Sequence, residues 1–257
     1  MSNFHPINNA FKERVKQAKQ EISAIVAGER SSQFQTHLQT ATYIAARSQS
    51  TSEAAKGTEP LTRKERAQYN QKVKPEEEKA LFEWAKNGNL WIEESKFNTQ
   101  FSSNYLDEGA EQKVYLNDDG VRVHKVNAGY FHGTWLEFFI RLITHKAIFP
   151  STAYKLTGFT EENGQFCAII EQQWVQVVRG ASKEEVEKFL IQIGFEHLKF
   201  NDYYNRDDGI ILEDLHDENV FVGADGNLLF VDPVIYLETP DLGLGGKISS
   251  VFPSGKC

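Results

Sequence analysis

Residues 213–233 have the sequence "EDLHDENVFVGADGNLLFVDP". Two short acidic clusters flank a segment in which apolar and polar residues alternate around the turn sequence "ADGN", a pattern typical of a β-hairpin. A loop with Asp214 and Asn219 therefore leads into a hairpin whose second strand delivers Asp232. The sequence predicts that these three oxygen-bearing side chains converge at one end of a small ribbon.

Three such side chains suit magnesium. Mg²⁺ prefers hard oxygen ligands, keeps several waters, and is typically held by one or two side chains plus the phosphates of a nucleotide. Asp214 is then free to accept a proton from an incoming hydroxyl group. The simpler alternative is that Asp214 and Asn219 only cap a turn, because Asp and Asn form local hydrogen bonds there.

Composition limits the class of protein. The 257 residues are 40% hydrophobic and 12% aromatic, which is enough to build a core. With 28 basic and 36 acidic residues the net charge is -8, and no Lys/Arg stripe indicates a nucleic-acid partner. Cys167 and Cys257 predict neither a disulfide framework nor a zinc site. Without a signal peptide or a membrane span in the sequence, we expect a cytoplasmic protein with no membrane partner.

The N-terminal third is predicted to be mostly helical. Residues 7–28 form an amphipathic helix with apolar residues at helical spacing. These residues are Phe11, Val15, Ala18, Ile22 and Ile25. Residues 29–60, rich in Ser, Thr, Gln and Ala, are expected to connect rather than pack. A second helical tract begins after Pro60, restarts at Pro75 and ends near Gly88.

From residue 90 the pattern changes to short apolar runs with turns at "NDDG", "EENG" and "ADGN", which predict hairpins. Between them lie two helical tracts, "GTWLEFFIRLITHKAIFP" (133–150) and "SKEEVEKFLIQIGFEHLKF" (182–200), the second opened by a capping box of Ser182 and Glu185. This order of hairpins and helices favours an α+β fold over a parallel doubly wound sheet.

The hairpin segment resembles a known family. Asp-Leu-x-x-x-Asn at 214–219, followed by an apolar strand and Asp232, is similar to the catalytic loop and metal-binding segment of the protein-kinase-like fold. "DLHDENVFV", "FVDPV", "WLEFFIRLITHKAIFPSTAYKLTGF", "IIEQQWV" and "EEEKALFEWAKNGNLWIEE" resemble the polyvalent-protein kinase family, a divergent group of bacterial and phage kinases. The resemblance covers about residues 76–238 and implies ATP and Mg²⁺ as cofactors.

The resemblance assigns roles residue by residue. Asp214 matches the catalytic base, Asn219 the metal ligand of the loop, and Asp232 the metal-binding aspartate. His216 stands where protein kinases often carry a lysine that stabilises the transferring phosphate. For His216 we expect at most a weaker contact of the same kind.

The same resemblance implies a nucleotide site upstream. "LDEGAEQKV" aligns with the glycine-rich loop, although Gly109 is the one glycine of three that survives. Val114 is expected to cover the adenine. Lys125 matches the strand lysine that contacts the phosphates. Glu137, on the following helix, is its expected partner, and Glu111 is the alternative.

The segment "AIIEQQW" resembles the strand and hinge beside the adenine, with backbone groups near Glu171 and Gln173 as the expected contacts.

Departures from ordinary protein kinases are equally informative. Leu212 and Glu213 replace the His-Arg of the catalytic loop, so control through a phosphorylated activation loop is not expected. Pro233 and Val234 follow the metal-binding aspartate, which is more similar to small-molecule kinases such as aminoglycoside and fructosamine phosphotransferases. The sequence ends at Cys257, which predicts a truncated C-terminal lobe.

The resulting prediction is a compact two-lobed protein-kinase-like fold. Residues 1–75 form a helical extension and linker, and residues 76–257 form the kinase-like domain. Within it, about 90–175 make the N-lobe and about 176–257 the C-lobe. The N-terminal helices offer a surface for a partner or a second copy, although packing on the body is the simpler expectation.

The predicted function is a protein Ser/Thr/Tyr kinase that acts on a protein substrate or on itself by autophosphorylation, for which Ser249, Ser250 and Ser254 are available. Two alternatives stay open. One is a small-molecule phosphotransferase, indicated by the Asp-Pro sequence after the metal strand. The other is a nucleotide-binding pseudokinase or interaction module, indicated by a glycine-rich loop that keeps one of its three glycines.

Overall fold

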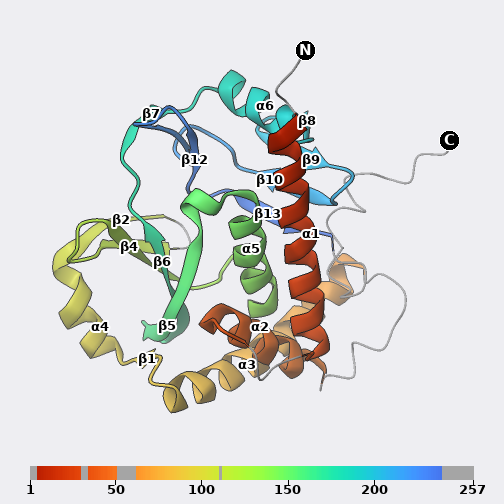
Figure 1. The fold of residues 1–257 in the computed structure, drawn as a ribbon. Helices are drawn as coiled ribbons and strands as arrows, with labels where there is room; N and C mark the ends of the chain where they lie inside the picture. The colour runs from red at the N-terminus through yellow and green to blue at the C-terminus, as the bar shows by residue number, and fades with distance from the viewer. Residues whose placement is uncertain (1–4, 30–33, 51–61, 110–111, 239–257) are drawn as a thin grey trace. The chain divides into compact units, whose positions relative to one another are not determined.

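The computed structural model describes residues 5–29, 34–50, 62–109 and 112–238, and Figure 1 shows their helices and strands. The helices are α1 (His5–Ala27), α2 (His37–Ser50), α3 (Arg63–Asn87), α4 (Glu94–Phe101), α5 (Trp135–Ile148) and α6 (Lys183–Gln192), with 3₁₀ helices η3 (Ser102–Asn104) and η4 (Pro150–Thr152). The strands are β1 (Trp91–Ile92), β2 (Tyr105–Glu108), β3 (Gln112–Leu116), β4 (Arg122–Asn127), β5 (Tyr154–Glu162), β6 (Gln165–Gln173), β7 (Val177–Gly180), β8 (Glu196–Lys199), β9 (Asp202–Asn205), β10 (Ile210–Glu213), β11 (Val220–Gly223), β12 (Leu228–Phe230) and β13 (Val234–Leu237). The predicted α+β class is confirmed.

The chain divides into two compact units. Unit 1 takes its described residues from Met1–Glu21, Ile143–Thr152 and Val175–Cys257, and unit 2 from Ile22–Leu142 and Ala153–Trp174. Helices α1 and α5 each contribute residues to both units. The two-lobed arrangement, with lobes at 90–175 and 176–257, and the extension 1–75 stay predictions.

Unit 2 contains a six-stranded sheet in the order β1-β5-β6-β4-β3-β2. The hairpins β3–β4 and β5–β6 confirm the turns expected at "NDDG" and "EENG". Asn163 and Gly164 at the second turn have φ of 51° and 77°. Positive φ at both central residues is the requirement of a type I′ turn, which fits the right-handed twist of the strands.

Helix α4, which the sequence did not reveal, covers one face of this sheet. Phe97 and Phe101 stack with their ring centroids 4.7 Å apart, and both rings contact Tyr115 of β3 edge-on. Val126, Cys167 and Ile169 complete this buried cluster. Since side chains alternate along a strand, the opposite face carries the other set, including Lys125.

Unit 1 contains a four-stranded sheet, β13-β10-β9-β8, and a three-stranded sheet, β12-β11-β7. The β11–β12 hairpin confirms the turn predicted at "ADGN". One core cluster joins α1, the end of α5, α6 and both sheets. It contains Phe11, Val15, Ile148, Phe149, Ala181, Val186, Leu190, Ile193, Phe195, Tyr203, Ile210, Leu212, Leu215, Val220, Phe230 and Ile235.

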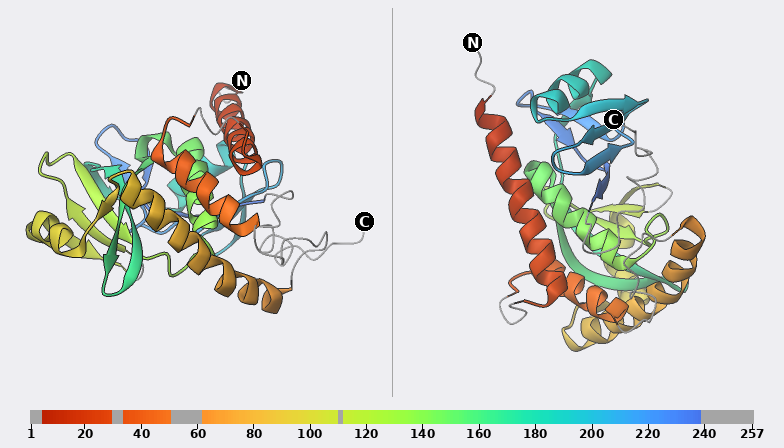
Figure 2. Two further views of the ribbon diagram at one scale, coloured as in Figure 1. Left: turned by 90° about the horizontal axis from the view of Figure 1, so that it is seen from below. Right: turned by 90° about the vertical axis from the view of Figure 1, so that its right-hand side faces the viewer.

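Helix α1 confirms the amphipathic helix predicted at 7–28. All five predicted apolar positions are buried, and the exposed positions between them are mainly polar. Within unit 1, Arg14 donates from Nε to the Ala147 carbonyl at the end of α5, at 2.8 Å. Figure 2 shows this part of α1 beside the C-terminal end of α5. The helix therefore packs on the body, as expected.

The break predicted at Pro75 is wrong, because α3 is continuous through it. Proline inside a helix removes one backbone hydrogen bond and costs about 3 kcal/mol. Contacts on either side of Pro75 offset this cost. Lys74 donates from Nζ to the Gly129 carbonyl at 2.6 Å, and Glu77 accepts from the Trp135 N–H at 2.7 Å.

The prediction that residues 29–60 only connect is also wrong where they are described, because α2 packs on α3. Leu38, Ala41, Thr42 and Ala45 are buried at helical spacing. Small side chains carry little hydrophobic signal, but they let two helices approach closely. The Thr42 hydroxyl is satisfied inside the helix by the Leu38 carbonyl, at 2.6 Å. Residues 51–61 lie outside the described part.

The helical tract predicted at 182–200 is correct in its first half alone. The Ser182–Glu185 capping box is present, and α6 runs to Gln192. Gly194, with φ of 93°, then redirects the chain into β8, which pairs with β9. Only glycine adopts this backbone conformation readily, so the helix ends there.

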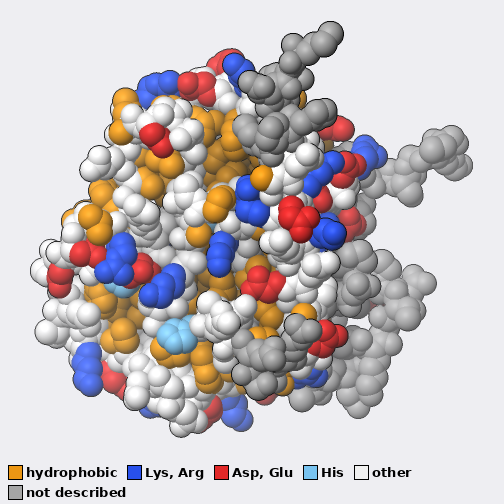
Figure 3. All heavy atoms as spheres, in the orientation of Figure 1, with side chains coloured by type: hydrophobic (Ala, Val, Ile, Leu, Met, Phe, Trp, Pro, Cys, Tyr) orange, Lys and Arg blue, Asp and Glu red, His pale blue; other side chains and the backbone are white. Residues whose placement is uncertain are grey.

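None of the helices in the described part of the chain is long and apolar enough to cross a bilayer. On the face shown in Figure 3, basic and acidic side chains are interspersed among hydrophobic ones.

Candidate catalytic site

The β11–β12 hairpin sets the position of Asp232 in unit 1. Val220 pairs with Phe230, and beyond this pair the Val231 N–H donates to the Asn219 carbonyl at 2.9 Å. Asp232 is the next residue along the chain. The backbone thus brings Asn219 and Asp232 to the same end of the ribbon.

Asp214 is joined to this ribbon end by the Asn219 side chain. Asn219 donates from Nδ2 to the Asp214 carbonyl at 2.9 Å and to Asp214 Oδ2 at 3.1 Å. Asp214 is exposed and has φ of 65°, in the left-handed region where Asp and Asn are the most tolerated residues after glycine. The amide of Asn219 therefore fixes both the carboxylate and the unusual backbone of Asp214.

His216 also contacts Asp214. Its Nε2 lies 3.3 Å from Asp214 Oδ1, and its Nδ1 accepts from the Glu218 N–H at 3.3 Å. The same Nε2 lies 3.1 Å from Asn219 Nδ2, so the side chains of Asp214, His216 and Asn219 form one cluster of polar contacts. The structure therefore places His216 beside the predicted base, on the same side of the carboxylate as Asn219 Nδ2.

The oxygens at the ribbon end fit a magnesium ion held partly by nucleotide phosphates. With its Nδ2 occupied by Asp214, Asn219 presents Oδ1 as its remaining acceptor, and Asp232 adds a half-buried carboxylate. One amide and one carboxylate match a site in which phosphates and waters supply the other ligands. Within the ranges that the structure describes, no three His, Cys, Asp or Glu residues group into a complete metal site of their own.

In unit 2, Lys125 lies on the sheet face opposite α4. Its cross-strand partners are Val114 on β3 and Ile170 on β6, and directly opposed residues share a face. The Lys125 side chain is 3% exposed, and its Nζ lies 5.3 Å from the centroid of the Tyr154 ring. The structure thus places the predicted phosphate-binding lysine and the predicted adenine cover, Val114, side by side on one face.

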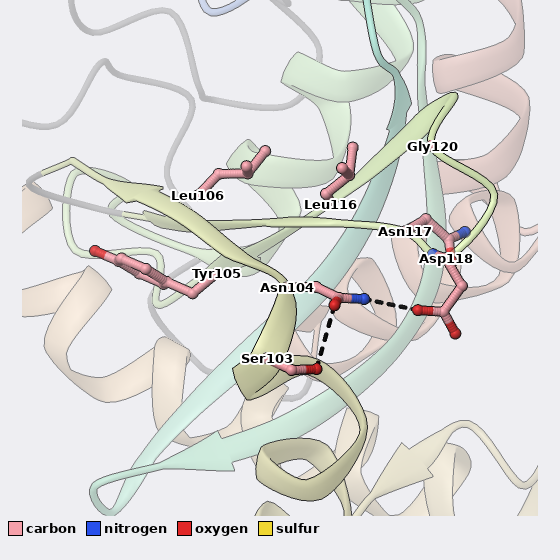
Figure 4. A pocket seen from close by; sticks show the side chains of 8 residues that line it. All are labelled: Ser103, Asn104, Tyr105, Leu106, Leu116, Asn117, Asp118 and Gly120. Atoms are coloured by element: carbon pink, nitrogen blue, oxygen red, sulfur yellow. Dashed lines mark hydrogen bonds between the residues drawn. The ribbon is translucent and has the colours of Figure 1, made fainter.

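Gly109 lies at the turn between β2 and β3, where its N–H donates to the Gln112 carbonyl at 2.8 Å. A Cβ added at Gly109 would meet no atom within 4 Å, so its backbone is open to a ligand. A pocket of about 390 Å³ lies at the other end of this hairpin, lined by η3, β2 and the β3–β4 turn (Figure 4). It contains none of the predicted site residues.

The two hinge contacts expected on β6 are not equivalent. The Trp174 N–H donates to the Val121 carbonyl at 2.8 Å, so even-numbered residues of β6 direct their backbone groups to β4. The backbone groups of odd-numbered residues point to β5, where Glu171 lies opposite its register partner Lys155. Gln173 points to the same side, beyond the first residue of β5, Tyr154. The backbone of Gln173 is therefore the available one, and the Glu171 carboxylate pairs with Arg122 at 2.9 Å.

Glu137 is not brought to Lys125. It lies in the first turn of α5, where one oxygen accepts from the Gly133 N–H at 3.0 Å and the other is 3.7 Å from Arg66 of α3. The alternative partner, Glu111, lies outside the described residues. A Lys125–Glu137 pair would require the start of α5 to rearrange, because the Glu137 carboxylate contacts Arg66 and the Gly133 N–H instead.

Glu77 of α3 fixes the start of α5, a role that sequence reasoning missed. It is fully buried and accepts from the N–H groups of Trp135 (2.7 Å) and Leu136 (3.3 Å) and from Gln49 Nε2 (2.8 Å). Burial raises the pKa of the Glu77 carboxyl to about 7. The sequence shows Glu77 as one of three consecutive glutamates, and nothing local distinguishes it from its neighbours.

Glu77 is expected to make the stability of unit 2 depend on pH. Its pKa of about 7 in the folded protein exceeds the ordinary value of 4.5, so the folded state binds the extra proton. The free energy of unfolding therefore falls as pH rises from about 4.5 to about 7, by on the order of 3 kcal/mol. Glu137 raises the Glu77 pKa slightly further, while the hydrogen bonds from Gln49, Trp135 and Leu136 oppose the shift.

Thermal unfolding between pH 5 and pH 8 measures this effect. Glu77→Gln is expected to flatten the decline in melting temperature, whereas Glu76→Gln, an exposed neighbour, keeps the wild-type slope. Equal slopes in both variants would show that Glu77 does not titrate in this range.

The predicted catalytic loop and ribbon lie in unit 1 and the Lys125-bearing sheet lies in unit 2, and the class of the protein follows from a comparison with known families. A comparison with models of protein families matches residues 74–239 to the serine/threonine/tyrosine kinases found in polyvalent proteins. The match covers more than half of the chain, and the chain belongs to this family, as the resemblance predicted. Comparisons with curated proteins and with solved structures find no match.

Proposed function

We propose that this chain is an ATP- and Mg²⁺-dependent protein kinase that transfers the γ-phosphoryl group to a Ser, Thr or Tyr hydroxyl of a protein. One observation carries the proposal. The Asn219 amide holds the exposed Asp214 carboxylate, and the Asn219 carbonyl anchors the strand that delivers Asp232. Turn-capping alone explains the first contact but not the second.

Asn219 and Asp232 would hold Mg²⁺, which neutralises charge on the phosphates when bound. Lys125 supplies a further positive charge for the phosphates. Its burial beside Tyr154 excludes water, which strengthens the electrostatic attraction between the ammonium group and the phosphates. The open backbone at Gly109 allows close approach of a phosphate. Val114 would cover a face of the adenine, and the backbone of Gln173 would contact its edge.

In the transfer step, the Asp214 carboxylate accepts the proton of the acceptor hydroxyl. The acceptor oxygen forms a bond to the γ-phosphorus, and the bond to the β-phosphate oxygen breaks, which releases ADP. Asn219 donates to one carboxylate oxygen and His216 lies beside the other, so Asp214 is oriented before the acceptor arrives. Catalysis consists mainly of positioning and charge stabilisation.

A small-molecule acceptor is the second candidate, favoured by the chain path after Asp232. Pro233 is buried, and Val234 enters β13 at once, where it pairs with Glu213 of β10. The segment that follows the metal-binding aspartate is therefore a strand of the sheet in this part of the chain, rather than a long loop that could support a peptide.

The test is incubation of the purified chain with γ-labelled ATP and Mg²⁺, alone, with a mixed protein extract, and with a panel of aminoglycosides and sugars. A protein kinase places label on protein, on the chain itself or on the extract, and loses it when EDTA removes the metal. Label confined to a small molecule would instead support the second candidate. Absence of any turnover, with a melting temperature raised by Mg·ATP, would overturn both and support a nucleotide-binding module.

A further inference from the structure

The Phe230 carbonyl accepts two buried hydrogen bonds. Thr152 donates from Oγ1 at 2.6 Å, and His145 Nε2 lies 3.2 Å away. Thr152 and His145 are 0% and 1% exposed. Both belong to the segment Ile143–Thr152, the end of α5 and η4 that forms part of unit 1 (Figure 1).

The register of the ribbon explains why this carbonyl needs partners. β12 is the edge strand of its sheet, and Val231 and Asn219 form a hydrogen-bonded pair. Pairs alternate along an antiparallel ladder, so Phe230 and Val220 are a non-bonded pair, and the Phe230 carbonyl points away from β11. Thr152 and His145 therefore take the place of a neighbouring strand at this edge.

The Phe230 side chain is fixed by the same segment. Its ring stacks on Phe149 with centroids 4.0 Å apart and planes 12° apart, and Phe189 of α6 packs at 5.4 Å. Both the ring and the carbonyl of Phe230 are thus clamped two residues before Asp232. Because the next residue, Val231, is hydrogen-bonded to Asn219, fixing Phe230 also restrains the ribbon end at which Asn219 and Asp232 lie.

We infer that Thr152 and His145 are positioning residues for the metal site, because they set where Asp232 stands relative to Asn219. The inference rests on the proposed function. Groups that orient a metal ligand without touching the metal typically change its affinity 10–100-fold when they are removed. Packing alone does not account for the pair, since two polar donors beside an apolar core both bind one carbonyl of β12, the strand that ends two residues before Asp232.

The test measures Mn²⁺ binding by electron paramagnetic resonance, in the presence of β,γ-imido-ATP. Thr152→Val keeps the shape of the side chain and removes the donor, and it is expected to weaken Mn²⁺ binding about 10–100-fold. Thr152→Ser restores the donor and is expected to return the affinity close to that of the wild type. His145→Phe against His145→Gln repeats the comparison at the second donor, in case one pair of variants folds poorly.

A matched control separates positioning from stability. Thr160 of β5 is also fully buried, and its hydroxyl donates to the Ile92 carbonyl at 2.8 Å, in unit 2. Thr160→Val is expected to lower the melting temperature comparably and to leave Mn²⁺ affinity unchanged.

The Asp232→Asn variant distinguishes an error in the proposed metal site from an error in the positioning role of Thr152 and His145. If it does not weaken Mn²⁺ binding, the proposed metal site itself is wrong. If it does, while Thr152→Val and His145→Phe both bind Mn²⁺ within about twofold of the wild type, the metal site stands and the positioning role is overturned.

Discussion

Asp214→Asn is expected to lower phosphoryl transfer about 10²–10⁴-fold, the usual contribution of a positioned general base. The substitution removes the proton acceptor and little else. Asn tolerates the left-handed backbone that Asp214 adopts at φ of 65°, and its amide oxygen can still accept from Asn219. The rate of label transfer from ATP at saturating Mg²⁺ measures the loss.

Asp217→Asn is the matched control, because Asp217 is an exposed acid of the same loop. It removes the same charge three residues away, and transfer is expected to stay within about twofold of the wild type. The KM for ATP and the melting temperature are expected to change little in both variants. Wild-type transfer by Asp214→Asn would remove Asp214 from the mechanism, and equal losses in both variants would indicate a general effect of loop charge.

The parts of the site that depend on local sequence could be predicted. The five-residue spacing from Asp214 to Asn219 lets the amide reach back to its own loop, and the "ADGN" turn determines the register that brings Asp232 to Asn219. The Lys125 face follows from strand alternation once the turn at "NDDG" is recognised.

The parts that depend on distant contacts could not be predicted. Glu77 and Thr152 act on residues 58 and 78 positions away, and neither differs in type from many exposed Glu and Thr residues. The expected pairing of Glu137 with Lys125 is absent for the same reason. Arg66, on a helix that the sequence placed in an extension, lies beside the Glu137 carboxylate instead.

Errors in the fold have a common cause, because tertiary packing overrode local signals. The Ala and Thr residues of α2 have weak hydrophobic patterning, yet they fit against α3. Pro75 is a helix breaker by itself, but Lys74 and Glu77 hold α3 on both sides of it. The strand β8 follows a helical pattern of apolar residues that Gly194 interrupts.

Phe11→Ala is expected to destabilise the protein by about 3–5 kcal/mol, the usual cost of removing a fully buried Phe. Phe11 is 0% exposed and meets Phe195 edge-on, with ring centroids 5.9 Å apart. It belongs to the same core cluster as Phe149 and Phe230, so the cavity opens in the core that supports the Asp232 strand. Chemical denaturation followed by circular dichroism measures the change.

Lys16→Ala tests whether the effect comes from burial, because Lys16 is exposed on the same helix, and a change within about 0.5 kcal/mol is expected. The comparison also bears on the family match, which begins at residue 74 and leaves out α1. A large loss in Phe11→Ala alone would show that α1 is part of the folded core of unit 1 and that residues 74–239 lack part of that core. Equal and small losses in both variants would instead show that α1 is a dispensable attachment.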